Sequence, residues 1–429
     1  MTTETDGVPG TPGTPHEPGV APTAPPGRLR LLTDPAVNSL IGATGTVGLA
    51  GAFVVPTVSL FLSEAVAATP LMIGLFFAGR AIAEVGTDLC VGVLSDRLRD
   101  RRTILVLTAL FNAGGALCYS LVRNYYALFL AGVVLFGLGG ACFGQLFAYT
   151  REFAESRRID VSFFNGFLRS ITSLAWVVGP PIAFWLVARW DFTVLYACTT
   201  GLSLLAAVLC RWGLPDVAQK REGAEPTGFR DMFRGIGRRP LLLLVSIVLL
   251  LAANMMYQIA LTLYLTEELG LGPGFAGVLL GLSAALEIPI MVYVGSRAER
   301  IGKLRLVVAA ALCATLFFAV LPFASDKPAL LLLQVPNAVW TAVVMSVPVV
   351  ILQDTLPGRL GVASSLYASA FKTGMFLGGL AVGLVATWTG YAQVFWVCAG
   401  LTALAALLLL LPHPAQAPEA VEPSEGKTA

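Results

Sequence analysis

Histidine is scarce in this chain, and cysteine occurs only in isolation. Only two of the 429 residues are histidine, and both, His16 and His413, lie in the terminal segments. The seven cysteines stand singly in apolar stretches, without a C-x-x-C pair or a neighbouring histidine. The usual ligand sets of metal sites are therefore missing. We expect no metal, no cofactor and no histidine-based acid–base chemistry.

The motifs of nucleotide-driven and hydrolytic proteins are also absent. The sequence contains no Walker loop, no G-x-S-x-G and no H-E-x-x-H, so it supports neither ATP-driven pumping nor common hydrolysis. The net charge is only +2, and the basic residues form short clusters between apolar runs. We therefore expect a protein that is not an enzyme and has no nucleic-acid partner.

Apolar residues are what the chain has in excess. They make up 56% of 429 residues, against 13% charged, with a mean hydropathy of +0.78. This lies outside the range of soluble domains. At about 20 residues per span, twelve membrane helices need roughly 240 residues, which matches the apolar content. The sequence predicts an all-α membrane protein in a lipid bilayer.

Apolar runs bounded by charged residues or by Pro and Gly predict twelve spans in two six-helix halves. The halves cover residues 36–212 and 241–412, joined by a cytoplasmic linker at 213–240, and the polar tails 1–35 and 413–429 are expected to be disordered. The predicted spans are 37–62, 71–95, 103–122, 126–148, 162–188, 193–212, 241–265, 272–296, 304–324, 328–352, 361–387 and 391–412.

Lysine and arginine predict the orientation. If the N-terminus is inside, the inner segments hold 21 of these residues and the outer loops hold three, Arg123, Arg189 and Lys327. Positive residues gather on the cytoplasmic side, so both termini are expected in the cytoplasm.

The two halves share a loop pattern. Gly92, Asp96 and Arg97 follow the second span, and a Gly-acid-Arg set at the same spacing, starting at Gly295, follows the eighth span 203 residues later. The Gly92-x-Leu-Ser-Asp96-Arg97 run resembles the signature loop of the major facilitator superfamily, without the glycine usual two positions on. The resemblance implies that the acid caps a helix of the opposite half and that the chain is built from two repeated six-helix halves.

A narrower resemblance covers nearly all of the membrane region. The segments 56–62, 173–181, 286–289 and 353–358, above all Ser-Leu-Ala-Trp176-Val-Val-Gly179-Pro180-Pro181, are similar to the sugar efflux transporters of bacteria. That resemblance implies proton-coupled export of small sugars or glycosides, by a protein in a bacterial inner membrane. Gly179 and Pro180 are expected to shape a closely packed, bent span that changes conformation.

Six ionisable residues lie inside spans, where burying a charge is costly and usually indicates function. Glu84 and Lys372 are predicted at equal depth, as are Arg169 and Glu287. The resemblance implies that the second span faces the eleventh and the fifth faces the eighth, so each couple is a candidate ion pair between the halves. Glu287 and Asp88 are the preferred proton carriers. Glu84 ranks third because Arg80, four residues earlier, can pair with it on the same helix.

The resemblance implies a central cavity lined chiefly by the first, fourth, seventh and tenth spans. Polar and aromatic residues on these spans are candidates for binding the solute, since amides bond vicinal hydroxyls and rings cover sugar C–H faces. Each of them has the alternative of a simple interhelical hydrogen bond. They are Gln145 in the fourth span, Asn254, Tyr257 and Gln258 in the seventh, and Gln334, Asn337 and Trp340 in the tenth.

The sequence leaves the solute open. A multidrug, antibiotic or metabolite exporter of the same superfamily is the alternative, and a sensor without transport is a third reading that the intramembrane charges disfavour. We expect the partners to be a sugar or drug-like molecule, protons and lipid, and the protein to be monomeric.

Overall fold

The computed structural model describes residues 33–95, 101–217, 237–356 and 360–411. In these ranges, twelve helices are long and apolar enough to cross a membrane, and no strand is found. The α-helices are α1 (Pro35–Leu60), α2 (Pro70–Ser95), α3 (Arg101–Leu121), α4 (Tyr125–Ala131), α5 (Gly137–Gly139), α6 (Cys142–Ser156), α7 (Val161–Arg189), α8 (Phe192–Val208), α10 (Arg238–Leu263), α11 (Pro273–Ile301), α12 (Lys303–Val320), α13 (Lys327–Leu332), α14 (Gln334–Thr355), α15 (Leu360–Thr389) and α16 (Ala392–Leu410).

The predicted spans are confirmed, with small shifts at their ends. The largest shift concerns the fourth span, which was expected to end at 148 but continues to Ser156. Its polar last turns form ion pairs, which lets the helix extend past the apolar run. This span also contains a π-helical turn, η3 (Gly132–Phe136), between α4 and α5. A π-turn inside a helix often marks a functional position.

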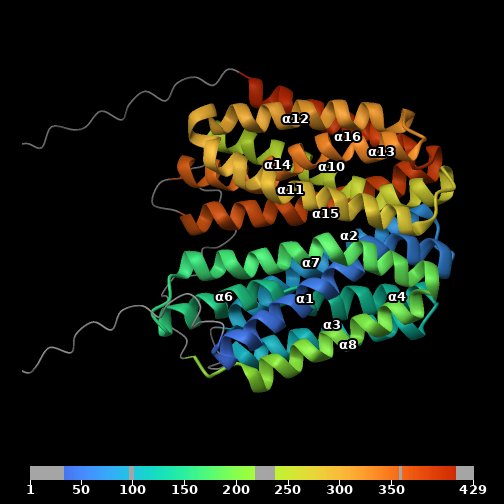
Figure 1. Cartoon of the computed structure of the whole chain (residues 1–429). Helices are drawn as coiled ribbons and strands as arrows, with labels where there is room; N and C mark the ends of the chain where they lie inside the picture. Colours follow the sequence, from blue (N-terminus) through green and yellow to red (C-terminus); the bar gives the residue numbers. More distant parts are fainter. Residues whose placement is uncertain (1–32, 96–100, 218–236, 357–359, 412–429) are drawn as a thin grey trace, which may run out of the picture.

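Two helical bundles lie side by side with their helices running in a common direction (Figure 1). One bundle contains α1 to α8 and the other α10 to α16. The main contacts between them join α2 to α15 and α7 to α11. This confirms the expected pairing of the second span with the eleventh and of the fifth with the eighth.

The halves repeat in structure as well as in sequence. Helices α1 and α2 begin at residues 35 and 70, and α10 and α11 begin at 238 and 273, which is 203 residues later in each case. The π-helical turns η2 (Phe61–Ala65) and η5 (Tyr264–Glu268) end the first helix of each half and keep the same spacing. A shared irregularity at one register position is strong support for an internal repeat.

An ion pair is repeated at one end of the bundles. In the first half Arg101 pairs with Glu152 at 2.9 Å, and in the second half Lys303 pairs with Asp354 at 2.6 Å. Both partners of the second pair lie 202 residues after those of the first. The pairs connect α3 to α6 and α12 to α14, so each half is held together at the same place.

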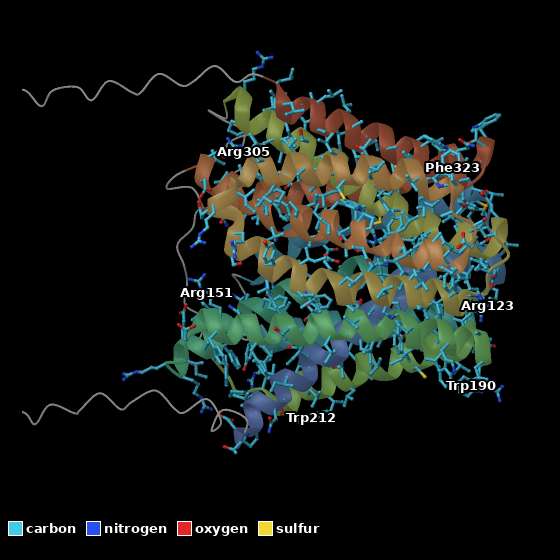
Figure 2. All side chains as sticks on the ribbon, turned by 45° about the horizontal axis from the view of Figure 1, so that its top comes forward. Arg123, Arg151, Trp190, Trp212, Arg305 and Phe323 are labelled. Atoms are coloured by element: carbon cyan, nitrogen blue, oxygen red, sulfur yellow. The ribbon has the colours of Figure 1, made fainter. Side chains whose placement is uncertain are left out.

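The bundle has two distinct ends. Figure 2 places Arg151 and Arg305 at one end, called here the Arg151 end, and Arg123, Trp190 and Phe323 at the other, called the Arg123 end. Helix α1 begins and α16 ends at the Arg151 end (Figure 1).

The halves meet most closely toward the Arg123 end, where glycines allow backbones to touch. A Cβ atom on Gly74 of α2 would lie 2.6 Å from the Cα atom of Gly383 on α15. A Cβ atom on Gly277 of α11 would lie 2.8 Å from the carbonyl oxygen of Pro180 on α7. This end of the interface is therefore closed by direct backbone contact.

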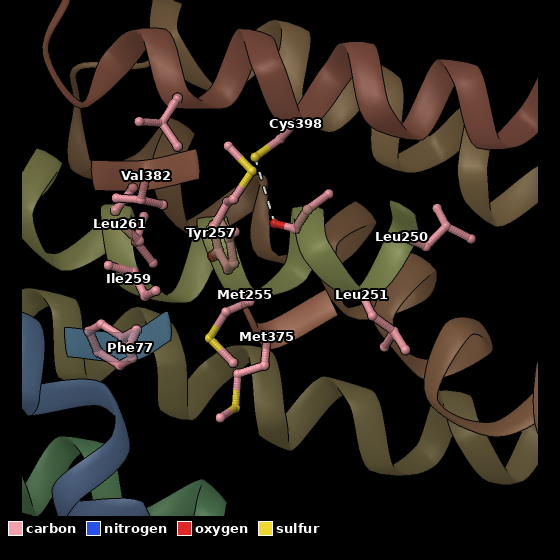
Figure 3. Packing of buried hydrophobic residues seen from close by; sticks show 14 of the residues in the cluster. Phe77, Leu250, Leu251, Met255, Tyr257, Ile259, Leu261, Met375, Val382 and Cys398 are labelled. Carbon is pink, nitrogen blue, oxygen red and sulfur yellow. Dashed lines mark hydrogen bonds between the residues drawn. The ribbon is translucent and has the colours of Figure 1, made fainter. Parts of the chain in front are cut away.

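The apolar core continues across the boundary. Figure 3 shows Phe77 of α2 beside Met255 and Ile259 of α10, within one buried cluster. The Cys398 thiol of α16 donates a weak hydrogen bond to the carbonyl oxygen of Ala253, at 3.6 Å. Helix α10 is thus enclosed by neighbours from both halves.

Candidate functional site

A cavity of about 760 Å³ lies between the halves. This volume falls within the roughly 300–1,000 Å³ typical of small-molecule sites. Residues of both halves line it, among them Trp176 of α7 and Asn254 of α10. A site on the boundary of two repeats is exposed or closed when the repeats move against each other.

The cavity opens toward the Arg151 end. Arg169 of α7 and Val292 of α11 line it and are exposed, Val292 to 71%. Further along the same helices, Pro180 and Gly277 are in contact near the Arg123 end. The same two helices therefore separate at one end and touch at the other.

Four of the seven predicted solute-binding residues line the cavity: Asn254, Tyr257, Gln258 and Asn337. The Gln258 amide donates to the Asn254 carbonyl oxygen at 2.6 Å, one helical turn away. This bond fixes both side chains on the cavity face of α10. The side-chain carbonyl oxygen of Gln258 and the side-chain amide nitrogen of Asn254 remain available for other partners.

Asn337 is the centre of a buried hydrogen-bond network. Its amide nitrogen donates to the oxygens of Ser283 at 2.9 Å, Gln334 at 3.1 Å and Tyr257 at 3.2 Å. Its own carbonyl oxygen accepts from the indole nitrogen of Trp340 at 3.0 Å. The network joins α10, α11 and α14, so it holds one cavity wall in a fixed arrangement.

The other three predicted residues lie outside the lining of the cavity. Gln334 and Trp340 are fully buried behind Asn337. Gln145 of α6 accepts a hydrogen bond from Arg101 at 3.1 Å, beside the repeated ion pair. In this conformation Gln145 and Gln334 bond between helices, which is the interhelical alternative, whereas Trp340 bonds Asn337 on its own helix.

Arg80 and Glu84 form the charged part of the opposite wall. The Arg80 Nε atom bonds the Glu84 carboxylate at 2.9 Å, and both side chains are about 85% buried but line the cavity. The guanidinium also lies 5.3 Å from the ring centre of Phe136. The Glu84 carboxylate thus has an ion-pair partner on its own helix, and its expected pairing with Lys372 across the boundary stays a prediction.

Arg169 and Glu287 both line the cavity, on the paired helices α7 and α11. They form no ion pair with each other in the part of the chain that the structure describes. Arg169 lies 5.3 Å from the ring centre of Phe147. Glu287 is set among apolar side chains and, within the described ranges, accepts no hydrogen bond.

Other predicted residues can be placed only in part. The side chains of Asp88 and Gly92, and residues Asp96 and Arg97 as a whole, lie outside what the structure describes. Gly179 and Pro180 are buried on α7. A Cβ atom on Gly179 would overlap the Cβ atom of Ala52, so this glycine sets how closely α7 approaches α1.

Several lining residues were missed by sequence reasoning. Ser283 and Thr341 each lie four residues from a predicted residue, Glu287 and Asn337, and so on the same helical face. That spacing could have revealed them. Asn112 and Ser203 also line the cavity, but they come from the third and sixth spans, which were not expected to reach it.

Comparison with known proteins agrees with this architecture. The family model described as Major Facilitator Superfamily matches residues 40–328 and 243–429. Two solved structures share the fold. The nucleoside transporter NupG has a TM-score of 0.75 at 14% identity, covering 87% of this chain and 97% of NupG. A bacterial homologue of the iron transporter ferroportin has a TM-score of 0.65 at 17% identity, covering 89% of this chain and 98% of the homologue.

Curated relatives are more similar in sequence. Sugar efflux transporter A of Escherichia coli (strain K12) is 37% identical, over 84% of this chain and 92% of the relative. Sugar efflux transporter B of Salmonella typhimurium is 34% identical over 81% of this chain and 88% of the relative. Sugar efflux transporter C of Escherichia coli (strain K12) is 32% identical over 85% of this chain and 92% of the relative. Matches of this extent, on a chain with twelve membrane helices in its described part, show that it belongs to the sugar efflux transporter family of the major facilitator superfamily.

Proposed function

We propose that this protein exports small sugars or glycosides through the membrane by alternating access, driven by inward proton flow. The observation that carries the proposal is the polar wall formed by Asn254, Gln258 and Asn337 inside the central cavity. The names of the curated relatives support the same solute class.

The chemistry of the wall suits a polyhydroxyl solute. An amide offers a donor and an acceptor side by side, which matches two neighbouring hydroxyl groups. Trp176 lines the same cavity and offers an aromatic face for the C–H side of a sugar ring. The Asn337 network uses most of that residue's own hydrogen-bonding capacity, so Asn254 and Gln258 are the main direct contacts.

The difference between the two ends of the boundary supports alternating access. The cavity opens at the Arg151 end, and the glycine contacts close the Arg123 end. Basic residues favour the cytoplasmic side of a membrane, so we place the Arg151 end, and with it both termini, in the cytoplasm of a bacterial cell. Rocking of the halves closes this end and opens the other.

Glu287 is the proposed proton carrier. Its carboxylate faces the cavity from an apolar stretch between Leu286 and Ile288, and such a setting favours the protonated form. Approach of Arg169 from α7 favours the ionised form and releases the proton. Movement of α7 against α11 thus couples the proton to the opening of the cavity.

A multidrug exporter is the second candidate, and one observation favours it. Four methionines line the cavity, Met255, Met291, Met345 and Met375, and flexible thioethers fit apolar molecules of varied shape.

Everted membrane vesicles with an imposed pH gradient test both candidates. We expect the gradient to drive accumulation of radiolabelled glucosides and not of cationic dyes or antibiotics. Accumulation of dyes without glucosides would support the second candidate. Vesicles from cells without the protein provide the background.

A further inference from the structure

The two halves place one carboxylate each at the same position of the repeat. Glu84 on α2 lies 203 residues before Glu287 on α11, which is also the spacing between the starts of these two helices. Both residues line the central cavity. The repeat therefore brings two related acidic groups to one cavity, one from each half.

The residue one helical turn before each carboxylate differs between the halves. In the first half it is Arg80, whose Nε atom bonds the Glu84 carboxylate at 2.9 Å. In the second half it is Ser283, whose hydroxyl oxygen accepts from the Asn337 amide at 2.9 Å. No residue in the described ranges forms an ion pair with Glu287. Related carboxylates in different environments are suited to different tasks.

Glu84 presents one carboxylate oxygen to the cavity. Its Oε1 atom accepts from Arg80, and its Oε2 atom accepts no hydrogen bond from the part of the chain that the structure describes. The side chain is 15% exposed and lines the cavity. An ion-paired carboxylate only accepts hydrogen bonds, and it accepts strong ones. The second oxygen therefore suits a hydroxyl group of a solute.

A purely structural role would not require charges at this place. Hydrophobic residues of similar volume often stabilise a buried site as well as an ion pair does, and charges inside a membrane span usually serve a function. The Arg80 guanidinium also lies 5.3 Å from the ring centre of Phe136, so the pair is held in place before a solute arrives. Groups that are fixed beforehand lose less conformational freedom on binding.

The pair lies across the cavity from the amide wall. Phe77 on α2 packs beside Met255 and Ile259 on α10 (Figure 3). Helix α2 runs away from the closed end of the boundary, and α10 runs toward it. Arg80, three residues further along α2, therefore lies about one turn nearer the open end, at the level of Asn254. A solute between these groups contacts both halves at once.

We propose that Glu84, held by Arg80, binds a hydroxyl group of the sugar from the first half, while Glu287 carries the proton in the second. The amides of Asn254 and Gln258 bond the opposite edge of the sugar ring. This inference rests on the proposed sugar transport and assigns its specificity. A solute must present hydroxyl groups at both edges to bridge the halves.

Deoxy sugars test the contact. Glu84→Gln keeps the shape of the side chain and an acceptor for Arg80 but removes the charge. Methyl glucoside and its monodeoxy analogues compete with a labelled glucoside for uptake into everted vesicles, which gives an apparent affinity for each. Loss of one particular hydroxyl should weaken binding to the wild type about tenfold or more. In Glu84→Gln the same loss should change the affinity less than about threefold, because the strong contact is already gone.

Arg151 and Glu155 supply the matched control. They form an Arg–Glu pair of the same spacing in the same half, at 3.1 Å, and neither residue lines the cavity. Glu155→Gln should keep the full dependence on that hydroxyl. If Glu84→Gln keeps it too and instead loses accumulation driven by a pH gradient, Glu84 handles the proton and the proposed contact is wrong.

A second variant keeps the test valid if the glutamine disturbs folding. Arg80→Met with Glu84→Leu leaves no charge unpaired, and we expect it to fold but to have a KM for the glucoside about tenfold or more above that of the wild type. An unchanged KM in this variant, or wild-type affinity that depends on no hydroxyl, would overturn the contact alone. Failure of the wild type to move any glucoside would overturn the proposed function as well.

Discussion

The Ser63 hydroxyl on η2 donates a hydrogen bond to the Glu267 carboxylate on η5, across the boundary between the halves. Both residues belong to the repeated π-helical turns at the Arg123 end. This bond, with the glycine contacts, closes the end that we place outside the cell.

Replacing Glu267 by alanine should loosen this closure. Hydrogen bonds to charged groups contribute about 1.5–3 kcal/mol when buried. Because this one is exposed, we expect about 1 kcal/mol, or roughly a fivefold shift toward the outward-open state. Distances between spin labels across the Arg123 end measure the shift.

Glu268 supplies the matched control for this prediction. Its carboxylate accepts from the backbone nitrogen of Ala392 at 3.2 Å, at the start of α16 within the same half. Glu268→Ala should lower the melting temperature without changing the distance distribution. If both variants shift the spin-label distances equally, the Ser63–Glu267 bond does not specifically hold the Arg123 end closed.

Replacing Glu287 by glutamine should uncouple transport from protons. The amide keeps the shape and hydrogen-bonding capacity of the protonated carboxyl but cannot release a proton. We expect sugar exchange between labelled and unlabelled pools to remain within about threefold of wild type, while accumulation driven by a pH gradient disappears. Both are measured in the same vesicles.

The control lies on the same helix. Glu299 is exposed and pairs with Lys303 at 2.6 Å near the end of α11. Glu299→Gln should preserve gradient-driven accumulation. Uphill transport by Glu287→Gln would assign the proton to another carboxylate.

Breaking the Arg80–Glu84 pair should cost stability. Glu84→Ala leaves the guanidinium buried without its carboxylate, and such loss typically costs about 3–5 kcal/mol. Replacing both residues, as in Arg80→Met with Glu84→Leu, should recover much of that loss because no charge is left unpaired. Melting temperatures of the purified proteins compare the variants, and an equally unstable double variant would contradict the argument.

Asn337→Ala should lower the stability of the protein and its affinity for the solute far more than Tyr257→Phe. The alanine removes the partner of Trp340 and Ser283 at once, and each unpaired buried group costs about 1–3 kcal/mol. The Tyr257 hydroxyl can be lost while Asn337 still bonds Gln334 at 3.1 Å. We expect a raised KM and a lowered melting temperature for the first variant and small changes for the second. Similar effects would show that Asn337 is not the centre of the network.

The helices could be predicted from the sequence because each span is a long apolar run between charged breaks. The fourth span was the exception, since its end at Ser156 depends on ion pairs that join distant residues. Repeated glycines and acids also predicted two related halves. The pairing of α2 with α15 followed from the resemblance to a known family and not from periodicity.

The site was predicted only in part. Helical spacing shows which residues share one face of a helix, but it does not show in which direction that face points. Asn337 faces the cavity, while Gln334 and Trp340 on nearly the same side face the interior of the half. Glu84 was expected to pair across the boundary, and the structure shows it paired with Arg80, four residues earlier on its own helix. Asn112 and Ser203 were missed because they lie on the third and sixth spans, which were not expected to reach the cavity.

The most direct test uses the purified protein in liposomes with labelled glucoside on both sides and a pH gradient of known direction. With external acid, protein oriented as in the cell should drive the glucoside out against its concentration, and collapse of the gradient with a protonophore should abolish this flux. Glucoside flux that is absent, or that is unaffected by the gradient, would contradict proton-coupled sugar export by this chain.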